Sequence, residues 1–207
     1  MPRPPRISKA DLADALLGVV ADQGMDAVSV RAVARAAGVS GGAVQYHFPT
    51  VEELRRAAYR RVIDRVTERA ERRAAEATSA KAFVRGLLLE LIPLDDERRT
   101  EVQAGLAFSA RSIHSPDLAE LYAEGYRALV GALEDALRAA VDRGEAAPGV
   151  DPRREAVVAA AVADGLAWHL TCAPSALAPD EAVGALDAHL DRLLPAGGTR
   201  PAGDSDR

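Results

Sequence analysis

Apolar residues recur at intervals of three and four along almost the whole chain, and no stretch alternates apolar and polar residues as a half-buried strand would. Helix-favouring Ala, Leu, Arg and Glu dominate. The pattern predicts helices over Ser8–Gly24, Ser29–Gly38, Ser40–Phe48, 50–78, Ser79–Pro93, Asp95–Ile113, two long segments that begin at Pro116 and Pro152, and 179–194. We therefore expect an all-α fold of about nine helices.

Residues that favour helix starts stand where most of these segments begin. An acidic residue follows Ser8 and Thr50 three positions later, which is the spacing of a capping box. Ser115 and Asp151 each stand directly before a proline, and proline is common at the first position of a helix. These signals place the boundaries independently of the apolar pattern.

The charge is divided unevenly along the chain, although the net charge is only −5. The first 75 residues contain 13 Lys and Arg against 9 Asp and Glu, a net charge of +4, whereas the remaining residues contain 13 against 22, a net charge of −9. A basic N-terminal part suits a module that faces phosphates. A solvated imbalance without a role is the alternative.

A single cysteine, Cys172, excludes an internal disulfide. No stretch has the composition of a signal peptide or the length of a membrane span, and the longest apolar run, 157–163, ends at Asp164. We therefore expect a cytoplasmic protein with no membrane partner.

Residues 29–48 read SVRAVARAAGVSGGAVQYHF. A serine precedes each of two short helices, and Gly38 lies in the tight connection between them, which is the arrangement of a helix-turn-helix. Val33, Val44 and Phe48 fall on faces that can share one core. Gly41, Gly42, Gln45 and Tyr46 are expected to point outward, with His47 at the helix end.

Exposed helical glycines cost about 1 kcal/mol each relative to alanine. Close approach of the helix backbone to DNA would offset this cost at Gly41 and Gly42.

The stretch from Asp11 to about Leu54, including GVSGGAVQYHFPTVEEL, resembles the DNA-binding region of TetR/AcrR-family repressors, and the later helices resemble the choline-operon-type subset of that family. The resemblance implies a transcriptional repressor that binds double-stranded, palindromic operator DNA as a homodimer, with Gln45 reading a base edge in the major groove. It implies the DNA-binding residues Arg3, Arg6, Ser29, Arg31, Ser40, Gly41, Gly42, Gln45, Tyr46, His47 and Thr50. For His47, a phosphate contact and a capping role both stay open.

Two positions depart from the family pattern. The family usually has tyrosine where this chain has Gln45, and lysine where it has Val51. The second change removes a phosphate contact, which Arg3, Arg6 and Lys9 could replace from a basic N-terminal arm.

This interpretation divides the chain into four segments. Residues 1–49 form a three-helix DNA-binding domain, 50–78 a connecting helix and 79–194 a helical ligand-binding and dimerisation domain. Residues 195–207, PAGGTRPAGDSDR, are expected to form a disordered tail.

By the same resemblance, the last two helices pair with their copies in a four-helix bundle across a two-fold axis. Their apolar stripes agree with such pairing. The expected interface consists of Val158, Val162, Gly165, Leu166, His169, Val183, Leu186, Leu190 and Leu193. Burial of these stripes within the monomer is the alternative.

The family senses small molecules within its C-terminal helices, so the resemblance implies that an unidentified effector releases the chain from DNA. Aromatic residues in this part can form the walls of an apolar pocket. The expected ligand-binding residues are Phe83, Leu87, Glu90, Phe108, Arg111, Ser112, Tyr122, Tyr126 and Trp168. Aromatic residues that merely fill the core are the alternative.

The sequence contains no glycine-rich phosphate loop, nucleophile elbow or recognisable pair of catalytic carboxylates, so we expect no enzyme activity and no cofactor. A metal-responsive regulator stays open, because His169 and Cys172 lie three residues apart and His114 or His189 could add a ligand. A regulator that responds to no ligand also stays open.

Overall fold

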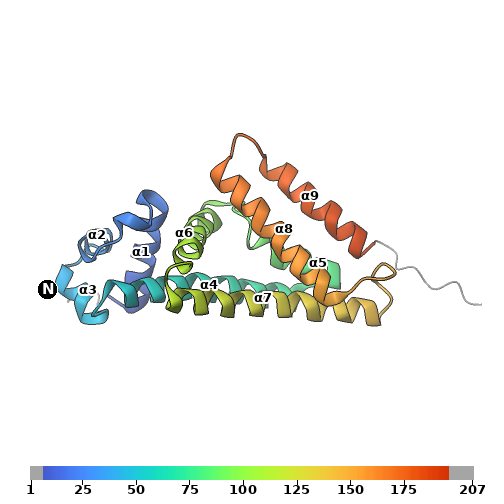
Figure 1. Ribbon diagram of the computed structural model, residues 1–207, viewed down its shortest axis with the longest axis horizontal. Coiled ribbons are helices and arrows are strands. Elements are labelled where there is room, and N and C mark those ends of the chain that lie inside the picture. The colour runs from blue at the N-terminus through green and yellow to red at the C-terminus, as the bar shows by residue number, and fades with distance from the viewer. Residues whose placement is uncertain (1–6, 196–207) are drawn as a thin grey trace, which may run out of the picture. The chain divides into compact units, whose positions relative to one another are not determined.

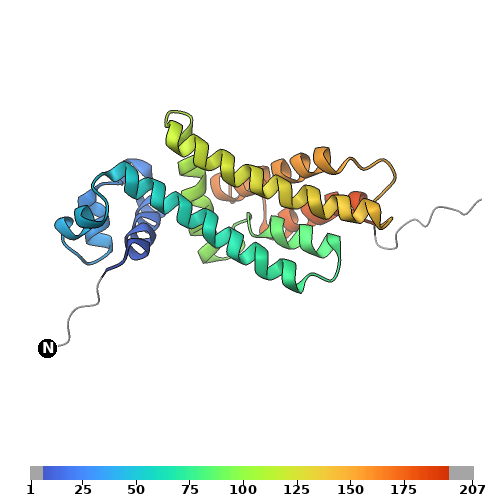
Figure 2. The ribbon, with the colours of Figure 1, turned by 90° about the horizontal axis from the view of Figure 1, so that it is seen from below.

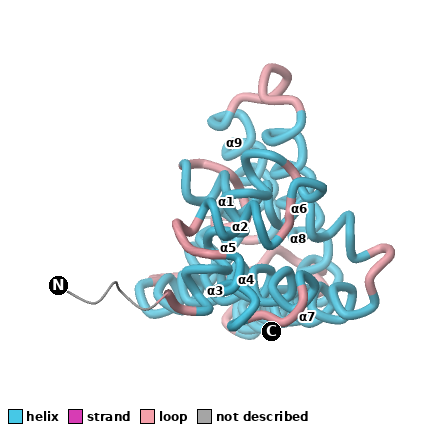
Figure 3. Tube along the Cα trace, turned by 90° about the vertical axis from the view of Figure 1, so that its left-hand side faces the viewer, coloured by secondary structure: helices cyan, strands magenta, loops and turns pink. Residues whose placement is uncertain are grey.

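The computed structural model describes residues 7–195, which form nine α-helices and one short 3-10 helix and contain no strand (Figure 1) (Figure 3). In chain order these are α1 Lys9–Gln23, the 3-10 helix η1 Met25–Ala27, α2 Val30–Ala36, α3 Gly41–His47, α4 Val51–Glu76, α5 Ala80–Leu89, α6 Asp96–Ser112, α7 Pro116–Asp142, α8 Pro152–Cys172 and α9 Pro179–Leu193. No helix in this range is long and apolar enough to cross a bilayer. The expected all-α fold is confirmed, and the tail expected over residues 195–207 lies outside the described residues except for residue 195.

Side-chain caps begin most of the helices for which the sequence predicts them, and among the described residues no such cap is seen at Ser115 before α7. Ser8 Oγ accepts a hydrogen bond from Asp11 N at 3.1 Å, and the Asp11 carboxylate accepts one from Ser8 N at 2.9 Å, so the first predicted capping box is present. The other residues whose side chains accept from a helical N–H three positions on are Ser29, Ser40, Thr50, Ser79, Asp95 and Asp151. Each such cap stabilises its helix by about 1 kcal/mol.

The helix expected to reach Pro93 ends earlier. Regular α5 stops at Leu89, and the N–H groups of Glu90, Leu91 and Ile92 bond carbonyl groups three residues back. Bonds of this 3-10 type tighten the last turn of a helix. They leave Glu90 at the C-cap, where its side chain is buried.

The described chain forms two compact units. Unit 1 comprises the described residues up to Glu68 together with Asp95–Gly125, and unit 2 comprises Arg69–Leu94 together with the described residues from Tyr126 onward. Helices α4 and α7 therefore each run from one unit into the other.

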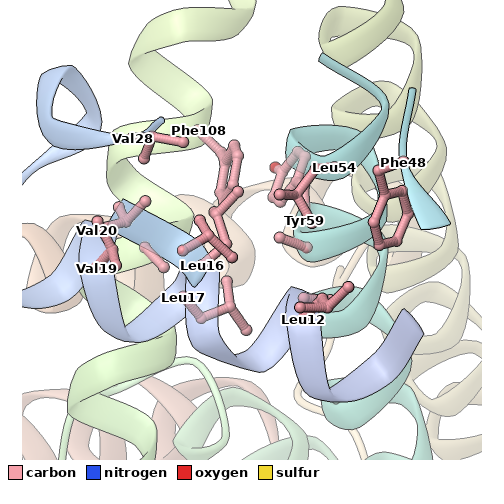
Figure 4. Close-up of a cluster of buried hydrophobic side chains, with 14 of the residues drawn as sticks. Leu12, Leu16, Leu17, Val19, Val20, Val28, Phe48, Leu54, Tyr59 and Phe108 are labelled. Carbon is pink, nitrogen blue, oxygen red and sulfur yellow. The ribbon is translucent and has the colours of Figure 1, made fainter. Parts of the chain in front are cut away.

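The core of unit 1 joins the first three helices to α4 and α6. Leu12 and Leu16 of α1 are fully buried, and Tyr59 of α4 stacks on Phe108 of α6 with ring centroids 5.0 Å apart (Figure 4). Leu54 belongs to the same cluster. The packing therefore continues across residue 49, where the sequence suggests a domain boundary, and the functional division of the chain stays a prediction.

Unit 2 has its own core, built from α5, α8, α9 and the second part of α7. Leu88, Leu133, Leu186 and Leu190 contribute fully buried side chains. Helices α8 and α9 lie side by side as an antiparallel hairpin (Figure 1). The side of α8 that packs inward consists mainly of alanines at positions 156, 159, 160, 163 and 167, and small side chains allow close helix packing.

A buried carboxylate, Glu90, joins the end of α4 to α5, which follows it after a short turn (Figure 2). The Nε atoms of Arg69 and Arg73 donate hydrogen bonds to the two Glu90 oxygens. Burial raises the pKa of Glu90, but the hydrogen bonds and charges of the two arginines outweigh it, so the pKa lies below its ordinary value of 4.5. Glu90 is therefore ionised and fully paired within unit 2.

The substitution Glu90→Gln tests this ion pair, because it keeps the size of the side chain and removes its charge. We expect a loss of about 2 kcal/mol in the free energy of unfolding near neutral pH. Since the folded-state pKa is lowered, the ionic contribution is present above the unfolded value of 4.5 and is lost as the pH falls through the folded-state pKa. Urea unfolding at a series of pH values measures both effects.

The matched control is Glu145→Gln. Glu145 pairs with Arg143 in the same unit, but its side chain is 44% exposed, and exposed pairs contribute little. Equal losses of stability in the two variants would contradict a special contribution of the buried pair.

Candidate nucleic-acid interface

A tight turn containing Gly38 connects α2 to α3. Gly38 has φ +66°, a left-handed conformation that favours glycine. The N–H groups of Ala37 and Val39 bond the carbonyl oxygens of Val33 and Ala34, both at 2.9 Å, and close the end of α2. The predicted helix-turn-helix is confirmed.

Only one side of α3 packs against the rest of unit 1. Val44 is fully buried and Phe48, which follows the helix, is 5% exposed. On the opposite side Gln45 is exposed, and Tyr46 is 82% exposed. The short helix therefore presents a bare polar face to solvent.

Packing within unit 1 does not require glycine at positions 41 and 42. A Cβ at Gly41 would meet Val30 Cγ1 at 3.6 Å, and one at Gly42 would meet Ser40 Oγ at 3.8 Å, both ordinary contact distances. Neither glycine has a positive φ. Gly42 is exposed as expected, whereas Gly41 is half-buried because it faces Val30.

The three hydroxyl residues expected to bind phosphates also act as helix caps. Ser29 Oγ, Ser40 Oγ and Thr50 Oγ1 each accept a backbone N–H hydrogen bond at 3.2 Å. All three residues are exposed. Because a hydroxyl has one hydrogen and two lone pairs, each can still donate to an acceptor outside the protein.

The remaining residues expected to contact DNA lie around α3 or outside the described residues. The rings of Tyr46 and His47 meet edge to face with centroids 5.2 Å apart, and His47 is half-buried. Arg31 is exposed on α2. Arg3 and Arg6 lie outside the described residues.

The nine residues expected to bind a ligand are divided between the two units. Unit 1 contains Phe108, Arg111, Ser112 and Tyr122, and unit 2 contains Phe83, Leu87, Glu90, Tyr126 and Trp168. Phe108 and Leu87 fill the two cores, and Glu90 is occupied by its arginines. Phe108 thus takes the core-filling role that the sequence leaves open for the aromatic residues, and the proposed ligand contacts of Leu87 and Glu90 stay predictions.

Trp168 lies outside the core of unit 2, and its proposed ligand contact stays a prediction. It is 51% exposed on the outer side of α8, because the inner side carries the alanines that pack. Phe83 and Tyr126 are half-buried against the core of unit 2, and their proposed ligand contacts stay predictions.

Arg111 lines an open hollow of about 340 Å³ in unit 1, together with residues of η1 and the end of α6. It donates to Glu52 Oε1 at 3.2 Å, and the Ser112 hydroxyl donates to the Ser109 carbonyl at 2.7 Å. Tyr122 is 39% exposed. Ligand contacts of Arg111, Ser112 and Tyr122 also stay predictions.

The leucines of α9 correct the expected dimer interface. Leu186 and Leu190 are fully buried and Leu193 is 8% exposed, because this side of α9 packs on α5 and α8 within the monomer. These three residues cannot form an exposed contact surface. Of the other six expected residues, Val158 and His169 are exposed, and Val162, Gly165, Leu166 and Val183 are half-buried.

The outer side of α8 carries a stripe that the sequence reasoning found only in part. Its members recur every three or four residues and are Val158, Ala161, Gly165, Trp168 and Cys172, referred to below as the α8 stripe. Ala161, Trp168 and Cys172 are exposed, and a Cβ at Gly165 would meet nothing within 4 Å. Recognising that the alanines face inward would have identified this outer face.

Within residues 7–195, no group of three or more His, Cys, Asp or Glu side chains is placed to hold a metal ion. His114 belongs to unit 1, whereas His169, Cys172 and His189 belong to unit 2.

Comparison with protein families gives two matches that together span most of the described chain. Residues 8–58 match the model of bacterial regulatory proteins of the tetR family. Residues 80–195 match the model of the C-terminal part of BetI-type transcriptional repressors.

Individual relatives agree with these matches. The chain is 28% identical over 191 residues to the HTH-type transcriptional regulator PksA of Bacillus subtilis (strain 168), with 89% of each protein covered. It is 31% identical over 160 residues to the HTH-type transcriptional regulator BetI of Rhizobium meliloti (strain 1021), covering 77% of this chain and 76% of that protein.

Solved structures share the fold. A transcriptional regulator from Rhodococcus sp. Rha1 superposes with a TM-score of 0.81 at 32% identity, covering 94% of this chain and all (100%) of that one. A transcriptional regulator from Saccharomonospora viridis, solved in complex with choline, gives a TM-score of 0.85 at 18% identity, covering 91% of this chain and 98% of that one. At that identity the second likeness shows the fold alone.

Proposed function

The chain belongs to the TetR family of bacterial transcriptional regulators, and we propose that it is a repressor that binds a palindromic operator as a homodimer through α3. The observation that carries this proposal is the bare face of α3, where Gln45 and Tyr46 are exposed and Gly42 leaves the backbone uncovered. Such a protein acts by binding rather than by catalysis. Its chromosomal target would place it in the cytoplasm.

The exposed face of α3 has the chemistry needed to read the major groove. The Gln45 amide can donate a hydrogen bond to N7 of adenine and accept one from its N6 amino group, because both groups lie on the same base edge in the major groove. Arg31 is exposed on α2, and the exposed hydroxyls of Ser29, Ser40 and Thr50 stand at the starts of α2, α3 and α4. These groups can bind phosphates, and such contacts orient a helix on DNA without reading sequence. Arg3 and Arg6 are proposed to add further phosphate contacts.

One α3 helix is too short to provide affinity and specificity alone, so the proposal requires two copies one DNA turn apart. The α8 stripe offers the surface for pairing, because Val158 and Trp168 are large apolar residues with 40% and 51% exposure in the monomer. The small residues Gly165 and Ala161 between them allow two copies of α8 to approach closely. In this arrangement the leucines of α9 support the interface from within the monomer.

We propose that an organic effector binds to the BetI-type part of the chain, residues 80–195, and favours a conformer in which α4 shifts and the two α3 helices no longer match the groove spacing. The choline complex of the Saccharomonospora viridis regulator supports the idea that this helical fold can bind a small molecule. The effector of this chain is not assigned by that likeness.

The substitution Gly42→Ala separates folding from DNA binding. Because the added Cβ finds ordinary contacts and alanine favours helices, we expect the free energy of unfolding to rise by up to about 1 kcal/mol. The same methyl group lies on the face proposed to enter the groove, so affinity for operator DNA should fall at least about tenfold. Thermal unfolding and fluorescence anisotropy with labelled duplex measure the two effects.

Gly184→Ala in α9 is the matched control. Gly184 is also an exposed helical glycine with open space around its Cβ position, but it lies far along the chain from α3. It should gain stability and keep its DNA affinity. Unchanged DNA binding by Gly42→Ala would contradict insertion of α3 into the groove.

The substitution Ala161→Glu tests pairing through the α8 stripe. Ala161 is exposed in the monomer, so the charge leaves the fold intact, but pairing would bury it without a partner. We expect sedimentation velocity to show monomers where the unmodified protein is dimeric, with operator affinity reduced at least about a hundredfold. Ala128→Glu, at an exposed position of α7, is the control, and a dimeric Ala161→Glu protein would rule out this interface.

A further inference from the structure

Lys9, the first residue of α1, lies beside the end of α3. Its Nζ atom is 5.5 Å from the centroid of the Phe48 ring, within the range of a cation–π interaction. Phe48 is 5% exposed and follows α3 directly, so the core of unit 1 holds the ring in place. The ammonium group is therefore held next to the end of α3 by a ring that cannot move freely.

Packing and ion pairing within the monomer give no reason for a cation at this position. Lys9 is exposed, and among the described residues no carboxylate pairs with it. A positive charge at the first position of a helix also opposes the helix dipole. The chain contains one other lysine, Lys81, and that one is paired with Asp191.

An open hollow of about 520 Å³ adjoins the same part of unit 1. It is lined by Ile7, Ala43, Tyr46 and His47. Ile7 precedes Lys9 by two residues. The lining thus combines apolar side chains with a phenol and an imidazole, and it includes His47, the neighbour in the chain of the Phe48 ring that Lys9 contacts.

This combination matches the sugar-phosphate backbone of one DNA strand. A deoxyribose presents apolar carbon atoms, and the phosphates on either side carry negative charge and hydrogen-bond acceptors. Val51, at the start of α4, packs against the core and supplies no charge. Lys9 is thus a cation placed to meet a phosphate beside the end of α3.

We propose that the hollow seats one strand of the operator backbone and that Lys9, held by Phe48, is a phosphate contact of the DNA-bound state. This inference rests on the proposed function, because it requires α3 to lie on DNA. It adds a contact from α1 that the base-reading face of α3 does not include. Since phosphates are the same in every sequence, Lys9 contributes to affinity and not to the choice of operator.

The first test compares Lys9→Gln, Lys9→Arg and the control Lys81→Gln on a fluorescein-labelled duplex of mixed sequence over a range of KCl concentrations. Loss of one phosphate contact lowers the slope of log affinity against log salt by about 0.9 for each protomer bound. We expect this change, and a loss of affinity of about fivefold at low salt, for Lys9→Gln. Lys9→Arg should restore both values, and Lys81→Gln should match the unmodified protein.

The second test uses the fact that the chain has two lysines. Brief acetylation with N-hydroxysuccinimide acetate, followed by mass spectrometry, reports the reactivity of each. The duplex should protect Lys9 severalfold and leave Lys81 unchanged.

The outcomes separate this inference from the proposed function. If the unmodified protein binds neither this duplex at low salt nor any duplex selected from a random library, the proposed function itself fails. If it binds, but Lys9→Gln keeps the same salt slope and DNA does not protect Lys9, the phosphate contact is refuted while DNA binding stands. Circular dichroism of each variant confirms that the fold is retained.

Discussion

The structure depends on the ion pairs of α4, the helix that runs through both units. Four of its arginines lie one helical turn apart, at Arg61, Arg65, Arg69 and Arg73, and all four form ion pairs. In unit 1, Arg61 and Arg65 reach Asp14 of α1 at 3.3 and 2.9 Å, and in unit 2 Arg69 and Arg73 hold Glu90. Because an unpaired buried charge is costly, the pairs at Glu90 restrict how α4 can be placed against α5, and the partly exposed pairs at Asp14 add a weaker restraint against α1.

This constraint gives the proposed regulation a physical route. The proposed effector acts on the BetI-type part of the chain, and α4 is the element that is tied by charge both to α5 in unit 2 and to α1 in unit 1. A displacement of α4 therefore carries the packed core of the helix-turn-helix with it, since Leu54 and Tyr59 of α4 belong to that core. The exposed face of α3 contributes nothing to that core, so its residues can be chosen for DNA binding without a loss of core packing.

Local signals made the helices and the helix-turn-helix predictable. Capping at Ser8 and Asp151 and the glycine at position 38 act through neighbouring atoms, and these interactions do not depend on tertiary contacts. The inward face of a helix was harder to predict where two faces are both apolar. In α8 the alanines pack inward and Trp168 faces outward. In α9 the apolar stripe of leucines suggested a dimer surface, but these leucines pack on α5 and α8 within the monomer.

The ligand-binding residues were the least predictable part, since their grouping depends on tertiary packing. Phe108 and Glu90 belong to different units and have different roles. Phe108 stacks on Tyr59 in the core of unit 1, whereas Glu90 pairs with Arg69 and Arg73 in unit 2. By contrast, most of the exposed face of α3 could be predicted, because Val44 and Phe48 determine which side is buried and Gln45 and Tyr46 must then be exposed. Gly41 is the exception, since its contact with Val30 of α2 depends on tertiary packing.

The most direct test of the central claim, that two α3 helices read one DNA site, is selection of bound duplexes from a random library by the unmodified protein, followed by sequencing. The account predicts an inverted repeat whose half-site centres lie about one helical turn apart, with one position in each half-site relaxed by Gln45→Ala. Enrichment of no sequence, or of a single site without symmetry, would contradict it.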